Sequence, residues 1–111
     1  MRYFNRDGEP INSLVWARLL RDPKYATVKA VRREVCEVVT SWVGVAADWE
    51  TVPQIFLVES RQLVRSVVDG KEQRDMEPLR DPTWCTTEQL ALAEHRKREK
   101  EIRCYPTDKP S

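Results

Sequence analysis

The sequence predicts a small α+β fold, in which an antiparallel sheet of three to four strands is flanked by an N-terminal and a C-terminal helix. The stretch from Val38 to Glu59 holds two of the four tryptophans and the one long run whose composition favours strand over helix. An apolar-faced helix pattern precedes this stretch, and a highly charged helix pattern follows it. Each helix has one face to bury, so we expect both to pack on the sheet.

Length and composition indicate one globular domain. The chain has 111 residues, of which 41% are hydrophobic and 33% are charged, as is typical of a globular protein with a charged surface. We expect the domain to span residues 1–104 and residues 105–111 to form a flexible tail. No apolar run approaches the roughly 20 residues that cross a bilayer, and the N-terminus lacks the apolar core of a signal peptide. We therefore expect a cytoplasmic protein with no membrane partner.

A first helix is predicted over residues 11–22. Asn12 is a good N-cap because its side chain can accept hydrogen bonds from the first-turn amides, and Ile11 before it can pack against Trp16. Pro23 disfavours a helical conformation at the preceding residue, so the helix ends there. The predicted apolar stripe consists of Val15, Trp16, Leu19 and Leu20.

Two strands are predicted next. Residues 25–32 alternate weakly between apolar and polar side chains, which is the period of a half-buried strand. Residues 35–45 are apolar on both faces, which predicts the central strand. Gly44 within this strand indicates a bulge or a close approach by another backbone.

The region after the central strand is predicted to be strand and then loop. Residues 54–59 form a third strand, and residues 63–68 either extend it past a kink at Ser60 or pair back as a fourth. Asp69 and Gly70 are a good hairpin turn. Because the residues that follow have little to pack, we expect residues 69–83 to be mostly loop.

The last element is a charged helix. Thr86 and Gln89 have the spacing of a capping box, in which Thr86 caps the first turn. Leu92 is followed by only one bulky apolar residue, Ile102. The second half of this helix is therefore expected to project into solvent.

Four blocks resemble a known family. In order, these are residues 3–11 (YFNRDGEPI), Trp16-Ala17, residues 40–44 (TSWVG) with 53–56 (PQIF), and residues 86–95 (TTEQLALAEH). Together they resemble small uncharacterised proteins of actinobacteria and their phages, which read YxDRDGxPI, WA, a STVWLGL-like strand, an IFE-like strand and a TEEEALAGH helix start. Two positions that are acidic in that family are occupied by Val15 and Leu57 in this chain. Residues 60–82 match no part of the family pattern. The resemblance implies a phage or prophage accessory protein with no known activity.

No motif indicates catalysis, a metal or a cofactor. Cys36, Cys85 and Cys104 form neither an even set nor a close pair, so we expect reduced thiols and no structural zinc. His95 is the one histidine, and we expect it to be a helix residue at the edge of the core. The sequence thus predicts a protein that is not an enzyme and that holds no cofactor.

Charge gives little support to nucleic-acid binding. The net charge is +1, from 19 Lys and Arg against 18 Asp and Glu, so no global basic field exists. Residues 95–101 (HRKREKE) are rich in Lys and Arg, but glutamates at helical spacing, such as Glu94 before Arg98, neutralise the run. A small nucleic-acid-binding regulator remains the alternative, and its candidate contacts are Arg32, Arg33, Arg96 and Arg98.

Two tryptophans favour a protein-binding role. Trp49 and Trp84 lie beside turn or cap residues rather than in periodic apolar stretches, and exposed tryptophans often anchor interfaces. The opposing interpretation is that each covers an end of the core. We expect a phage accessory factor that binds a host protein, with inhibition of a host enzyme or of a defence system such as CRISPR as its function. A homodimer through the second apolar face of the sheet is also expected.

Overall fold

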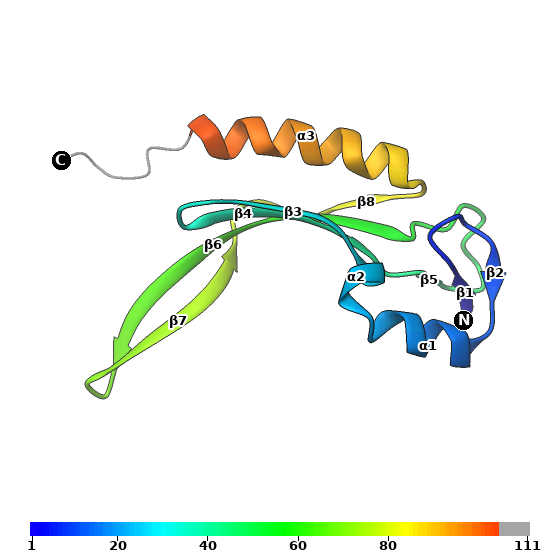
Figure 1. Ribbon diagram of the computed structural model, residues 1–111, viewed down its shortest axis with the longest axis horizontal. Helices are drawn as coiled ribbons and strands as arrows, with labels where there is room; N and C mark the ends of the chain where they lie inside the picture. The colour runs from blue at the N-terminus through cyan, green and yellow to red at the C-terminus, as the bar shows by residue number, and fades with distance from the viewer. Residues whose placement is uncertain (105–111) are drawn as a thin grey trace.

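The structure is a computed structural model, and it describes residues 1–104 (Figure 1). The predicted α+β class is confirmed, because antiparallel sheets occur together with an N-terminal and a C-terminal helix. The helices are α1 (Ser13–Leu20), α2 (Pro23–Ala26) and α3 (Glu88–Cys104). The strands are β1 (Arg2–Phe4), β2 (Pro10–Ile11), β3 (Thr27–Arg33), β4 (Cys36–Trp42), β5 (Val45–Ala46), β6 (Phe56–Val68), β7 (Lys71–Pro78) and β8 (Thr83–Cys85). Residues 105–111, predicted to be a flexible tail, lie outside the described residues.

The larger sheet has five strands, which is more than the three to four expected. Its order is β3-β4-β6-β7, and β8 also pairs with β6. Strands β8 and β7 share one edge of β6, because β8 pairs with residues 56–58 and β7 with residues 61–68. Helix α3 lies along one face of this sheet and contacts β3, β4, β6 and β8 (Figure 1).

The core lies between α3 and the sheet and continues to the N-terminal end of the fold. One buried cluster includes both Phe4 and Ile102, so the first strand and the last helix share a core. Most of its members come from the strand-rich stretch of residues 38–59: Val38, Trp42, Ala46, Ile55, Phe56 and Val58. Trp42 joins the two ends, because its indole Nε1 donates to the Phe4 carbonyl oxygen (3.0 Å) and its ring meets Tyr25 edge-on.

A small second sheet and α1 form the N-terminal end of the fold. Strand β1 pairs with β2 and with β5. Asn12 caps α1 as predicted, since its side chain accepts a hydrogen bond from the Val15 amide (2.9 Å). Trp16 packs on Tyr3 and donates from Nε1 to the Val43 carbonyl oxygen (2.8 Å). Helix α1 therefore attaches to the rest of the fold through Trp16, and Leu19 also packs against the core.

Gly44 is where the chain passes from the larger sheet to the smaller one. The prediction of a close backbone approach is confirmed, because the Phe4 amide donates to the Gly44 carbonyl oxygen (2.8 Å). Gly44 has φ +66°, and a Cβ there would overlap both the Phe4 carbonyl oxygen and the Trp42 ring. Glycine alone fits this position without strain.

The prediction that residues 69–83 are mostly loop was wrong. Residues 71–78 form β7, which pairs with β6 along its whole length. The kink at Ser60 is also absent, since β6 runs unbroken through it. Asp69 and Gly70 make the predicted turn, with φ of 53° and 76°, as a type I′ hairpin requires. Every residue of β7 is exposed, so pairing rather than packing forms this strand.

Two expectations for α3 need correction. The first-turn cap is Thr87 rather than Thr86, because Thr87 Oγ1 accepts from the Leu90 amide (3.2 Å), whereas Thr86 Oγ1 donates to the Pro53 carbonyl oxygen (2.7 Å). The second half of α3 does not project into solvent. Ala91, His95, Arg98 and Ile102, at helical spacing, are all buried against the sheet.

We predict that Gly44→Ala destabilises the fold by about 3 kcal/mol, because it combines a positive φ with overlap in a packed site. Gly8→Ala is the matched control, since Gly8 has φ +84° but open space around it. It should cost only about 1 kcal/mol. Urea denaturation of both variants measures the difference, and equal losses would show that the approach of Phe4 does not constrain Gly44.

Candidate functional site

The face of the larger sheet opposite α3 carries no helix along its centre (Figure 1). Thr40 and Ser60 face α3, because their hydroxyls bond to His95 and Arg98 of that helix. Alternation along each strand then places the intervening residues on the opposite face. We call this set the open face: Glu37, Val39 and Ser41 of β4, Leu57, Glu59 and Arg61 of β6, and Trp84 of β8.

The open face is mixed in character rather than apolar. Arg61 pairs with Glu59 (2.7 Å) and lies 3.8 Å from Glu37 on the neighbouring strand. Val39 is buried, yet it does not belong to the main core cluster. The sequence predicts a second apolar face and a dimer through it. Only part of the open face is apolar, because Glu37, Glu59 and Arg61 also lie on it.

Beyond the base of the sheet, β6 and β7 continue as a projecting hairpin, which we call the arm (residues 63–76; Figure 1). Pairing of β6 with β4 ends at Gln62, and the Leu63 amide makes one further bond to the Val35 carbonyl oxygen (2.7 Å), so beyond Leu63 β6 pairs with β7 alone. Val67 is 74% exposed, and Val68 and Met76 are also exposed. A two-stranded hairpin that packs on nothing is marginally stable by itself. The arm is therefore a surface that a partner would stabilise.

A second surface lies at the other end of the sheet, around Trp84. This residue is 48% exposed and borders two hollows of about 420 and 290 Å³. Leu90 lines the first hollow and Glu50 lines the second. Trp49, the residue directly before Glu50, is 85% exposed. We call Trp49, Val52, Trp84 and Leu90, which are all exposed, the tryptophan surface.

Trp49 is held outward by a tight turn. The Glu50 amide donates to the Ala47 carbonyl oxygen (3.1 Å), and the Ala47 amide donates to the Glu50 carboxylate (2.8 Å). Arg2 reinforces the turn by donating to the Ala47 carbonyl oxygen (3.1 Å). Trp49 thus occupies a central position of a turn that is hydrogen-bonded at both ends, which lowers the entropy lost when it binds.

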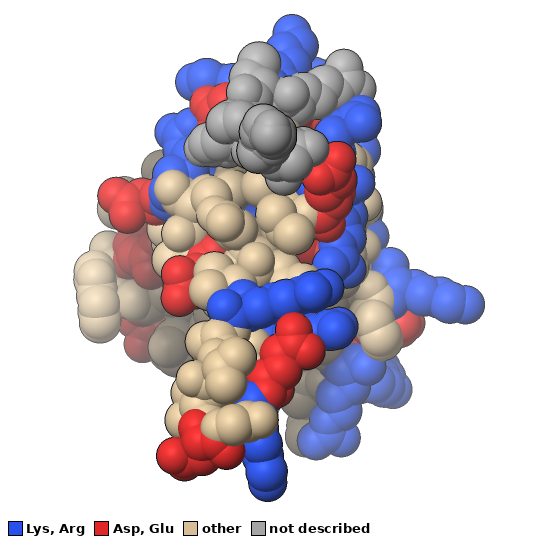
Figure 2. Space-filling model, turned by 90° about the vertical axis from the view of Figure 1, so that its left-hand side faces the viewer, with Lys and Arg blue, Asp and Glu red and all other residues tan. Residues whose placement is uncertain are grey.

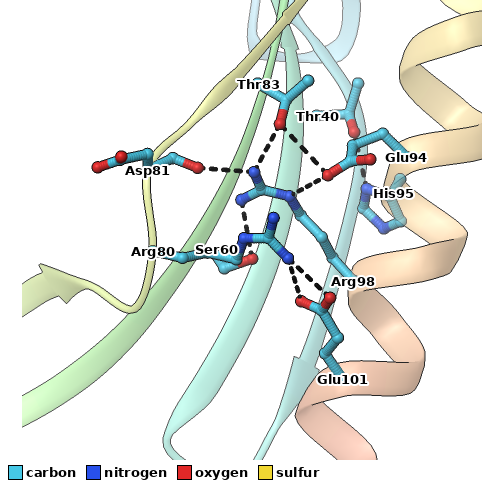
Figure 3. Close-up of polar contacts among 9 residues, drawn as sticks. All are labelled: Thr40, Ser60, Arg80, Asp81, Thr83, Glu94, His95, Arg98 and Glu101. Carbon is cyan, nitrogen blue, oxygen red and sulfur yellow. Dashed lines mark hydrogen bonds and ion pairs between the residues drawn. The ribbon is translucent and has the colours of Figure 1, made fainter.

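A buried arginine joins α3 to the larger sheet (Figure 3). The side chain of Arg98 is 0% exposed. Its Nε donates to Glu94 Oε2 (2.8 Å), and its Nη1 donates to Ser60 Oγ (3.0 Å). Its Nη2 donates to the Asp81 carbonyl oxygen and to Thr83 Oγ1, both at 2.7 Å. Every nitrogen of the guanidinium therefore has a partner, as a buried charge requires.

These contacts fix the segment that links the arm to the tryptophan surface. Asp81 lies between β7 and β8, and Thr83 precedes Trp84. Arg80 in the same segment bonds to the Glu101 carboxylate on α3 (2.7 Å; Figure 3). The direction of the arm and the position of Trp84 thus both depend on α3.

Glu94 completes this cluster as an ion. Burial alone would raise the pKa of the Glu94 carboxyl, but the hydrogen bond and charge of Arg98 outweigh it, with smaller help from Thr83 and Lys97. The pKa of Glu94 accordingly lies below its ordinary value. The carboxylate stays charged and balances the guanidinium at neutral pH.

His95 is buried one turn before Glu99, beneath β4. Its Nδ1 lies 2.7 Å from Thr40 Oγ1, and its Nε2 lies 3.2 Å from Glu99. Burial lowers the pKa of His95, Glu99 opposes that effect and Lys29 adds to it. His95 was predicted to lie at the edge of the core, and its side chain is in fact fully buried.

The thiols of Cys36 and Cys85 are free and buried. Burial, followed by the charges of Glu34 and Glu94 respectively, raises the pKa of each thiol, although Arg98 lowers that of Cys85. Raised pKa values make thiols poor nucleophiles. Within the described part of the chain, no group of three His, Cys, Asp or Glu side chains could hold a metal ion.

The four candidate arginines do not share one surface. Arg32 pairs with Glu37 in register and so lies on the open face, whereas Arg33 follows it on the other face. Arg96 is exposed on α3, and Arg98 is enclosed. Figure 2, which views the end bearing the arm, shows basic and acidic side chains interspersed rather than separated by sign.

Comparison with known proteins gives no relative: no family model, curated protein or solved structure matches the chain. None of the described helices has the length and apolar character needed to cross a membrane.

We predict that Arg98→Met destabilises the fold by about 4 kcal/mol, because it leaves the Glu94 carboxylate without its buried partner. Arg96→Met, an exposed change on the same helix, should stay within about 0.5 kcal/mol of the parent. Urea denaturation of the two variants tests this. Similar stabilities would show that the enclosed guanidinium does not hold α3 to the sheet.

Proposed function

We propose that this chain is a protein-binding accessory factor, without enzymatic activity, that attaches to its partner through the tryptophan surface. The observation that carries the proposal is the exposure of two tryptophans near each other: Trp84 borders a hollow that Glu50 also lines, and the exposed Trp49 directly precedes Glu50. Tryptophan anchors that fill or border pockets dominate the energetics of protein interfaces. A contiguous exposed apolar patch on a folded protein often marks an interaction site.

The resemblance to actinobacterial and phage proteins supports a narrower proposal. In it the chain is a phage or prophage protein in the cytoplasm of its host, and the partner is a host protein that it inhibits, such as a host enzyme or a component of a CRISPR defence. Small size and a surface of mixed charge suit an inhibitor that covers a site on a larger protein. Arg32 lies on the open face and Arg98 is enclosed, so the four candidate arginines of the nucleic-acid alternative do not form one contact surface.

The experiment is capture of partners from an actinobacterial lysate by the tagged full chain, with half of each sample treated with nuclease. We predict that one host protein is retained in both halves. Its affinity for purified Trp49→Ala and Trp84→Ala variants should fall about 30-fold, which corresponds to a loss of about 2 kcal/mol per anchor. Titration calorimetry measures the affinities.

Leu14→Ala is the matched control, because Leu14 is 82% exposed on α1 and belongs to neither surface. It should bind like the parent chain. Equal affinity of all variants would refute binding through the tryptophan surface. Loss of every captured protein after nuclease treatment would favour the nucleic-acid alternative instead.

A further inference from the structure

The outer edge of β7 is an unpaired strand edge on the arm. Among residues 1–104, β7 pairs only with β6, which leaves the backbone groups of its other edge unpaired. The tight Asp69–Gly70 turn fixes the twist and register of the arm. An exposed edge of this kind is a template for another strand unless its side chains prevent pairing.

Over residues 71–75 the charges along this edge are antisymmetric about Gln73. The residues read Lys71, Glu72, Gln73, Arg74 and Asp75, so the signs are plus, minus, none, plus and minus. When two such strands pair antiparallel about Gln73, Lys71 meets Asp75 and Glu72 meets Arg74 of the second strand. Each of these pairs brings opposite charges together across the strands, which is favourable.

We propose that a second copy of this chain binds along the outer edge of β7, antiparallel and centred on Gln73, so that two arms form one four-stranded sheet. The two-fold axis passes beside Gln73, as a symmetric dimer requires. In this arrangement the Gly70 turn of one arm lies opposite Met76 of the other and covers part of that exposed side chain.

The same charges oppose the neighbouring arrangements. A symmetric antiparallel pair centred on Glu72 or on Arg74 places two like charges at the axis. A parallel, in-register pair places each charged residue opposite its own copy. Like charges directly opposite are destabilising. The pattern thus selects one register and also discourages strands of other proteins, which is how edge charges usually act.

A second feature points to a missing partner on the arm. Within one chain, Arg65 of β6 lies directly opposite Arg74 of β7. Glu72 relieves part of this repulsion, because its carboxylate lies 3.8 Å from Arg65 Nε. In the proposed dimer, Glu72 of the second copy lies opposite Arg74 and compensates part of this repulsion. The dimer would therefore offset a contact between like charges that one chain leaves on the arm.

Charge exchange at Lys71 and Asp75 tests the proposal. Within the arm these residues lie opposite Val68 and Val64, so changing their charge breaks no ion pair in the monomer. Sedimentation equilibrium of the full chain at low salt should show a dimer for the parent. The single variants Lys71→Glu and Asp75→Lys should each dimerise on the order of tenfold more weakly, because two contacts become repulsive. The double variant should recover the parent affinity.

Mixing the two single variants gives the sharpest result. Lys71→Glu carries two negative charges where Asp75→Lys carries two positive ones, so the mixture should form a heterodimer although neither variant self-associates well. Lys24→Glu, with the same charge change at an exposed site on α2, should dimerise like the parent. Failure of the parent to dimerise at any reachable concentration, or absence of the heterodimer, would overturn the proposal. The dimer does not use Trp49 or Trp84, so variants of those residues separate it from the proposed function.

Discussion

The structure depends on the pairing of one strand, β6, along both of its edges. Residues 56–62 pair with β4 on one edge, and β8 and β7 share the other. The first half of β6 lies in the core, where Phe56 and Val58 are fully buried, and the second half leaves the core as the arm. A single continuous strand therefore runs from the buried core of the fold into the exposed arm.

Helix α3 fixes the segment between β7 and β8, and with it the positions of the arm and of Trp84. Its buried face supplies His95, Arg98 and Ile102, of which Arg98 reaches across to the segment between β7 and β8. Replacing a buried ion with apolar residues would often be neutral for stability, so a buried guanidinium is best explained by the geometry that it imposes. Here that geometry relates the arm to Trp84, and so to both proposed binding surfaces.

Local chemistry allowed much of the fold to be predicted from the sequence. The Asn12 cap, the Asp69–Gly70 turn and the close approach at Gly44 each follow from backbone rules that need no tertiary context. The missed features needed that context. β7 carries no apolar face because it packs on nothing, so periodicity could not reveal it. The charges around Arg98 predict a solvated run, although Ala91, His95, Arg98 and Ile102 have the spacing of one helical face, which is buried.

The central claim is that the outer edge of β7 is paired only when a second copy is present. Amide hydrogen exchange of the full chain at low and high protein concentration tests it most directly. The account predicts that outward-facing amides of β7 exchange fast in dilute samples and slowly in concentrated ones, while amides of β4 stay protected throughout. Exchange in β7 that does not change with concentration would contradict the account, because it would show that the arm is equally ordered with or without a partner copy.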